Sequence, residues 1–203
     1  MPRSYDSSVR SERVLENRQR IISAAHALFL SNGWTATTMT QVASAAALAR
    51  PTMYLHFQTK LELLIACIDS ALSDVPVRNR SDYRAMAQGT LPQRAATAAQ
   101  WLRRAYERSA AIQRVLDDAA TSNPDAAVKQ TQMEQRRHDE FGNACQLVLG
   151  DRTPPKSLVD EVWALGSRDV WFALADRGWS PNDWETWFVR LILDAVARHD
   201  LEH

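Results

Sequence analysis

Glycine, cysteine and long apolar runs are all scarce in this sequence. Its 203 residues include only 6 glycines and 2 cysteines. Cys67 and Cys145 have no close partner and no metal-ligand spacing, which favours two reduced, buried thiols over a disulfide framework or a redox switch. No apolar run approaches the roughly 18 residues that a membrane span needs. The first twenty residues also lack the apolar segment of a secretory signal. These absences predict a cytoplasmic protein.

Helix-forming residues make up much of what is present. Alanine, leucine, arginine, glutamate and glutamine are abundant, and nothing alternates over a useful length with the period of a strand. The sequence therefore predicts an all-α fold of about nine helices and no sheet. In the second half of the chain, apolar spacing and breakers place helices at about 93–107, 109–120, 125–149, 157–177 and 181–199.

Charge is unevenly distributed along a chain whose formal net charge is zero. Residues 1–60 carry seven Lys and Arg against three Asp and Glu, a net charge of +4, and residues 61–203 therefore carry −4. A basic N-terminal part on an acidic body suits a protein that meets nucleic acid with that part alone. The excess of positive charge is small, so the prediction of nucleic-acid binding also needs a motif.

The segment Gly33–Lys60 predicts two short helices joined by a tight turn. Asn32-Gly33 ends the helix before it, because glycine tolerates a left-handed backbone, and Thr37 or Thr38 can cap the first short helix. Pro51 suits the first turn of the second helix, where a missing N–H costs nothing. Helical spacing gives the pair one inner face, formed by Met39, Val42, Ala43, Ala46, Met53 and Phe57.

The outer face of this pair has the residue types that a helix-turn-helix presents to DNA. In such a motif the second helix enters the major groove, about 12 Å wide, and the first helix braces it. Arg50 could bind a guanine, and Pro51 or the Thr52 methyl group could touch a thymine methyl. The candidates for phosphate contacts are Thr38, Thr40, Tyr54, His56 and Lys60. A compact helical hairpin without a ligand has the same spacing, so spacing alone leaves both interpretations open.

A longer pattern runs through this segment. Its members are Gly33, Thr37-Thr38, Val42-Ala43, Ala46, Leu48, Thr52-Met53-Tyr54, His56-Phe57, Lys60 and Leu63-Leu64. The pattern resembles the DNA-binding domain of the tetracycline-repressor (TetR) family of bacterial transcriptional regulators. By position, the resemblance implies DNA contacts at all the outer-face candidates named above. Ala47 stands where the family usually has a turn glycine and Ala49 where it has a capping serine, and each departure would cost about 1 kcal/mol.

The resemblance implies a homodimeric repressor that binds a near-palindromic operator in double-stranded DNA. In this family, helices near the C-terminus pair with their copies, and the last two predicted helices here are rich in tryptophan, which suits buried interfaces. The candidate interface residues are Trp171, Trp184, Trp187, Phe188 and Leu191. An intrachain core would explain the same residues, so both interpretations stay open.

A small-molecule effector that releases the operator is also implied by the resemblance. An apolar or aromatic effector would suit the candidate wall residues, which are Trp101, Tyr106, Met133, His138, Phe141 and Trp163. Residues 1–12 are then a mobile arm, 13–60 the helix-turn-helix DNA-binding domain, and 61–200 the larger effector-binding and dimerisation domain. Residues 201–203 resemble the start of a purification tag.

Two other classes of protein compete with a regulator. An all-helical enzyme would need a catalytic motif, and the sequence has no HExxH, no P-loop and no GxSxG pattern. We therefore expect neither an enzyme nor a bound cofactor or metal ion. The alternative is a helical adaptor that never touches DNA, and operator binding would separate the two.

Overall fold

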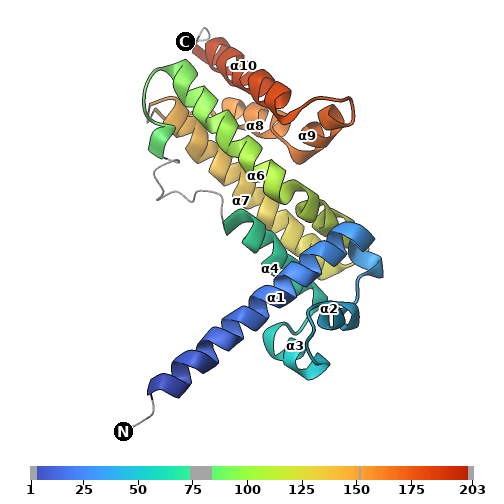
Figure 1. Cartoon of the computed structure of the whole chain (residues 1–203). Helices are drawn as coiled ribbons and strands as arrows, with labels where there is room; N and C mark the ends of the chain where they lie inside the picture. Colours follow the sequence, from blue (N-terminus) through green and yellow to red (C-terminus); the bar gives the residue numbers. More distant parts are fainter. Residues whose placement is uncertain (1–3, 74–83, 151, 201–203) are drawn as a thin grey trace. The chain divides into compact units, whose positions relative to one another are not determined.

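The computed structural model describes residues 4–73, 84–150 and 152–200, which form helices and turns without a strand (Figure 1). The helices are α1 (Ser4–Ala36), α2 (Met39–Ala45), α3 (Arg50–His56), α4 (Lys60–Ser73), α6 (Leu91–Ala120), α7 (Pro124–Val148), α8 (Lys156–Leu165), α9 (Arg168–Ala175) and α10 (Pro181–Asp200). The predicted all-α fold is confirmed. Within this part of the chain, no helix has the length and apolarity to cross a bilayer. The possible tag at 201–203 lies outside the described residues.

The chain divides into two compact units, each with its own core. The first unit contains Met1–Ala71 and Ala111–Gln130, and the second contains Leu72–Ala110 and Thr131–His203. The long helices α6 and α7 therefore contribute residues to both units. The predicted division of the chain into an arm, a DNA-binding domain and an effector domain is a division by function, and it stays a prediction.

Helix α1 is longer than predicted and is interrupted near its end. It begins at Ser4, so most of the segment predicted as an arm is helical. The expected stop at Gly33 is confirmed, because its backbone (φ 73°, ψ −175°) leaves the helical region for one that only glycine adopts readily. The buried Thr37 hydroxyl then donates to the carbonyl oxygens of Leu28 (3.1 Å) and Gly33 (2.8 Å). These bonds fix the path of the chain from α1 into α2.

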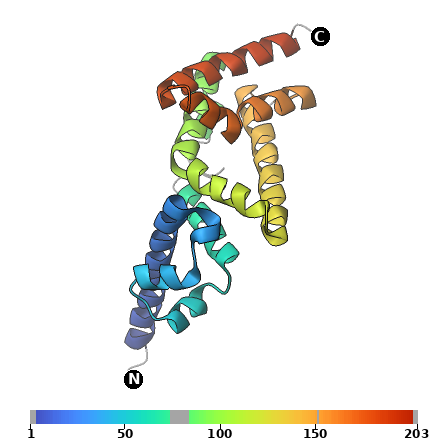
Figure 2. The same cartoon turned by 90° about the vertical axis from the view of Figure 1, so that its right-hand side faces the viewer.

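The core of the first unit is built on the predicted inner faces. Figure 2 shows α2 and α3 as two short helices beside α1, and α2 packs against both α1 and α3. The residues with at most 5% of their surface exposed include Ile21, Ala25, Phe29, Val42, Ala43, Ala46, Met53, Phe57, Leu64 and Ile68. Helical periodicity therefore identified the side chains that hold the helix pair.

Both cysteines are buried and reduced, as predicted. Burial raises the pKa of Cys67 and of Cys145 to about 12, because the low-dielectric surroundings disfavour the thiolate. The thiolate is the reactive form of cysteine, so these two side chains act as small apolar core residues.

Two helix boundaries predicted for the second unit are wrong. The break expected near residue 108 is absent, because Ser109 lies inside the continuous helix α6 and donates its hydroxyl to the Ala105 carbonyl at 2.7 Å. The single helix expected over 157–177 is instead broken at Gly166 into α8 and α9. A Cβ at Gly166 would lie 2.8 Å from the Phe188 ring and 2.9 Å from the Phe141 ring. Ser167 then begins α9 as its N-cap, its hydroxyl accepting a hydrogen bond from the Val170 N–H at 3.3 Å. The close packing explains why residue 166 carries no Cβ.

Aromatic side chains form the centre of the second unit, where α10 packs on α8 and α9. Trp184 is 1% exposed, stacks on Phe188 with ring centres 4.8 Å apart, and meets Trp171 edge-on at 5.1 Å. Tyr106 lies at the edge of this cluster and donates its hydroxyl to the Gly166 carbonyl. Tryptophan and tyrosine bury large apolar areas, so this cluster accounts for much of the unit's stability.

Candidate nucleic-acid interface

Helix α2 begins with a reciprocal cap. The Thr38 hydroxyl accepts a hydrogen bond from the Gln41 N–H at 3.2 Å, and the Gln41 side-chain oxygen accepts one from the Thr38 N–H at 2.8 Å. This capping box satisfies two of the amide groups that the start of a helix leaves unpaired. Thr38 and Thr40 are both exposed, and a phosphate that binds Thr38 would share its hydroxyl with the cap.

Helix α2 ends in a left-handed turn that lacks glycine. Ala47 has a φ of +53°, and no other non-glycine residue in the described ranges has a positive φ. The Leu48 N–H bonds to the Ala43 carbonyl and the Ala47 N–H to the Ser44 carbonyl, both at 3.0 Å, which is the bonding pattern of a Schellman motif. The turn therefore keeps the geometry that a glycine would suit, and the Cβ of Ala47 is strained.

We expect Ala47→Gly to raise the free energy of unfolding by about 1 kcal/mol, because glycine enters the left-handed region without a Cβ penalty. Denaturant unfolding measures the change. The matched control is Ala45→Gly, an exposed position in the helical part of α2, where the same substitution should lower stability by about 1 kcal/mol. A loss of stability from both substitutions would contradict strain at Ala47.

Helix α3 is anchored from one side and open on the other. Met53 and Phe57 are completely buried, whereas Tyr54 is 42% and Leu55 85% exposed. Ala49 occupies the N-cap without a side-chain hydrogen bond, as predicted. Sequence reasoning did not select Leu55, although its spacing from the anchoring residues was a usable signal. The other candidates on α3 are solvent-accessible: Arg50 and Pro51 are exposed, and Thr52 and His56 are half-buried.

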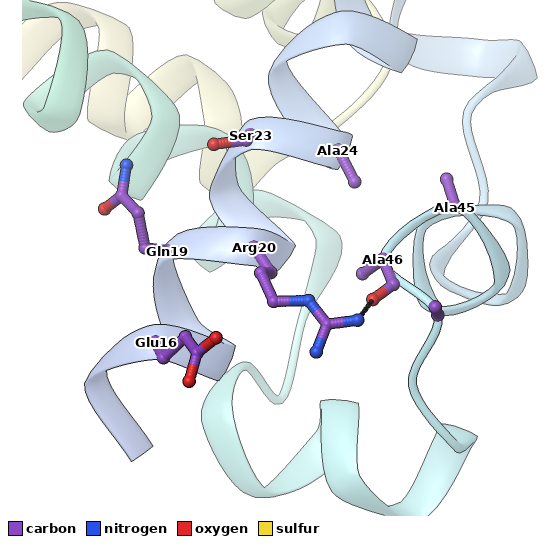
Figure 3. A pocket seen from close by; sticks show the side chains of 8 residues that line it. Glu16, Gln19, Arg20, Ser23, Ala24, Ala45 and Ala46 are labelled. Carbon is purple, nitrogen blue, oxygen red and sulfur yellow. Dashed lines mark hydrogen bonds between the residues drawn. The ribbon is translucent and has the colours of Figure 1, made fainter. Parts of the chain in front are cut away.

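Cationic side chains of the first unit bind carbonyl groups at helix ends. Lys60 Nζ donates to the Trp34 (2.7 Å) and Thr37 (3.0 Å) carbonyl oxygens and lies 4.1 Å from the centre of the Trp34 ring. Arg20 of α1 donates to the Ala46 carbonyl at the end of α2 at 2.6 Å (Figure 3). In Figure 3 this arginine reaches across an open groove between α1 and α2. The end of a helix favours such cations, because its last carbonyls lack partners and its dipole is negative there.

Arg18 makes the equivalent contact at the end of α3. One of its guanidinium nitrogens donates to the His56 carbonyl at 3.4 Å, and the group lies 4.3 Å from the centre of the Phe57 ring. Part of the positive charge of residues 1–60 is therefore used to hold the helix pair together. Sequence reasoning missed this role of Arg18 and Arg20, because each contact joins residues more than 20 positions apart.

Lys60, a predicted phosphate contact, already has two partners within the first unit. Two of its three N–H donors already bind carbonyl groups, and burial lowers the pKa of its ammonium group. Breaking these bonds to reach a phosphate would leave the carbonyls unpaired. We therefore propose that Lys60 chiefly supports the helix pair and omit it from the DNA contacts proposed below; its phosphate contact stays a prediction.

The predicted effector-site residues lie in several environments. Tyr106 and Phe141 are buried in the core of the second unit, and Trp101 and Met133 are partly buried. His138 meets Trp163 edge-on at 5.4 Å. Nε2 of the His138 ring lies 2.8 Å from the Asp160 carboxylate.

An ion-pair network that the sequence did not indicate lies beside them. Arg137 contacts Glu134 at 2.9 Å and packs over the Trp163 ring, 4.9 Å from its centre. Arg168 contacts the other carboxylate oxygen of Glu134 at 2.8 Å. Burial raises the pKa of Glu134, but the two guanidinium groups outweigh that effect and leave the pKa lowered. The predicted effector-site residues are therefore surrounded by charged side chains as well as apolar ones.

The predicted dimer residues fall into two groups. Trp184 and Phe188 are 1% and 2% exposed and belong to the core of their own chain. A side chain without accessible surface cannot form the face that meets a partner, so these two are reassigned to the core. Trp171, Trp187 and Leu191 are partly exposed and can contribute to a surface.

The fold and this site define a class of protein. An all-helical chain with a braced helix pair, whose second helix is open to solvent, has the architecture of a helix-turn-helix DNA-binding regulator. Residues 21–67 match the family model described as "Bacterial regulatory proteins, tetR family". That range covers α2 and α3 with the end of α1 and the start of α4.

Known proteins resemble this chain over different lengths. The transcriptional repressor KstR of Mycobacterium tuberculosis is 27% identical over 163 residues, which are 78% of this chain and 72% of KstR. The regulator SrpR of Pseudomonas putida is 44% identical over 55 residues, which are 27% of this chain and 26% of SrpR. The crystal structure of MexZ, a repressor from Pseudomonas aeruginosa, superposes with a TM-score of 0.62 at 20% identity, covering 90% of this chain and 94% of MexZ.

Residues 21–67 are therefore a DNA-binding domain of the TetR type, and the chain is similar to TetR-family regulators. The match and the relatives show a DNA-binding transcriptional regulator. The predicted family and class of function are thereby confirmed.

Proposed function

We propose that this protein is a homodimeric repressor that binds a near-palindromic operator through α3 and leaves it when a small effector binds. The observation that carries the proposal is the asymmetry of α3, whose Met53 and Phe57 are buried while Tyr54 and Leu55 face solvent. A recognition helix needs such an arrangement, since one side must be held by the protein while the other enters the major groove.

The proposed DNA contacts are those of the sequence prediction without Lys60. In this proposal Arg50, Pro51 and Thr52 meet base edges, and Tyr54 and His56 bind phosphates. Thr38 and Thr40 would add contacts from the start of α2. Repression is the proposed direction of control because KstR and MexZ are both repressors.

Dimerisation is proposed through the C-terminal helices of the second unit. Trp171, Trp187 and Leu191 offer partly exposed apolar surface there, and Trp179 adds a ring that is 37% exposed. A two-fold dimer would place its two α3 helices one turn of DNA apart, about 34–36 Å, which is why the operator should be near-palindromic.

The effector is proposed to bind in the second unit and to favour a dimer that DNA cannot accommodate. The aromatic residues Trp163 and Tyr106 support an aromatic effector. The charged side chains of Glu134, Arg137 and Arg168 nearby suit one that also carries a polar group.

Fluorescence anisotropy with duplex fragments from the DNA upstream of the gene tests the proposal. Wild-type protein should bind one fragment in preference to random DNA, and Tyr54→Ala should weaken that binding about tenfold, because one hydrogen bond is lost in each half-site. Val128→Ala, an exposed apolar position on α7, is the control and should bind as wild type. A folded wild-type protein without preference for any fragment would favour the adaptor instead.

A further inference from the structure

Leu55 occupies the outermost position of α3. Successive residues of an α-helix are rotated by about 100°, so Leu55 lies about 160° around the helix from Met53. Met53 is completely buried, whereas Leu55 is 85% exposed, more than any other large apolar residue whose exposure the structure describes. The part of α3 that projects furthest from the protein is therefore a leucine side chain.

The neighbours of Leu55 divide into an apolar tip and two polar flanks. Pro51 and Thr52 lie within about 60° of Leu55 around the helix, and each presents carbon atoms, the proline ring and the threonine methyl group. Tyr54 and His56 lie about 100° from Leu55, one on each side. Both flanking residues can bond to phosphate oxygens, whereas Leu55 can neither donate nor accept a hydrogen bond.

This division matches the chemistry of the major groove. The walls of the groove are phosphates, and its floor displays the edges of the bases. Among the groups on that floor, the C5 methyl group of thymine is the apolar one. With Tyr54 and His56 at the walls, the Leu55 side chain reaches the floor, where contact with a thymine methyl removes apolar surface of both partners from water.

We infer that Leu55 reads a thymine methyl group in each operator half-site. The inference rests on the proposed function, and it assigns part of the sequence specificity to a contact without a hydrogen bond. Because deoxyuridine differs from thymidine only by that methyl group, binding should distinguish the two at one symmetric position.

The experiment begins with selection of preferred sites from a random duplex library by the wild-type protein. Each thymine of the selected site is then replaced, in both half-sites together, by deoxyuridine. At one position the replacement should weaken wild-type binding about tenfold, the effect of burying about one methyl group in each half-site. Leu55→Ala should bind the thymine and uracil operators within about twofold of each other.

Leu30→Ala is the matched control, because Leu30 is an exposed leucine (46%) on α1. It should keep the wild-type preference for the thymine methyl, and circular dichroism should show that both variants are folded. The inference is overturned if no thymine methyl affects wild-type binding, or if Leu55→Ala keeps the full preference. A library that yields no selected site with folded protein contradicts the proposed function itself, and the inference falls with it.

Discussion

Replacing Trp184 with alanine is expected to lower the free energy of unfolding by about 3–5 kcal/mol. The side chain is 1% exposed and contacts Phe188, Trp171 and Tyr106 at the centre of the second unit. Its removal would leave a cavity that the surrounding rings cannot fill, because each is itself held by further contacts. Denaturant unfolding followed by circular dichroism measures the loss.

Trp187→Ala is the comparison, since Trp187 lies one helical turn from Trp184 but is partly exposed. It should cost less folding stability and should weaken self-association, as measured by analytical ultracentrifugation. The assignment of Trp184 to the core would be wrong if Trp184→Ala left unfolding unchanged and abolished the proposed self-association.

Lys60→Met is expected to lower the free energy of unfolding by about 2 kcal/mol, because two charge-assisted hydrogen bonds to the Trp34 and Thr37 carbonyls are lost. Methionine keeps the apolar stem but cannot donate. Operator binding then gives a second readout. A lysine that binds a phosphate contributes about 0.9 to the slope of log affinity against log salt concentration, whereas a lysine that binds carbonyls contributes nothing.

The slope should therefore be the same for Lys60→Met and wild type at temperatures where both are folded. Lys129→Met, an exposed lysine on α7, is the control for removing a charge, and it should leave stability unchanged. A reduced slope with unchanged stability would return Lys60 to the phosphate contacts.

Local patterns predicted the DNA-binding part of the molecule well. The inner face of the helix pair, the stop at Gly33 and the strained turn at Ala47 are all where the sequence placed them. Each depends on residues within a few positions of one another, so spacing and backbone preference were sufficient. The boundaries in the second unit were predicted less well, because Ser109 continues α6 by bonding to the Ala105 carbonyl and Ser167 begins a separate helix after Gly166.

The sequence by itself determined the fold class, the family and the place of the recognition helix, because these follow from periodicity and short-range motifs. Only the tertiary structure decided which side chains are available. Lys60 is occupied by carbonyls 23 and 26 positions away, and Trp184 is enclosed by rings from other helices. Leu55 is left at the tip of α3 because its neighbours Met53 and Phe57 are buried. Whether a side chain is free to contact DNA or a partner depends on contacts between residues far apart in the sequence. Those contacts exist only after the chain has folded.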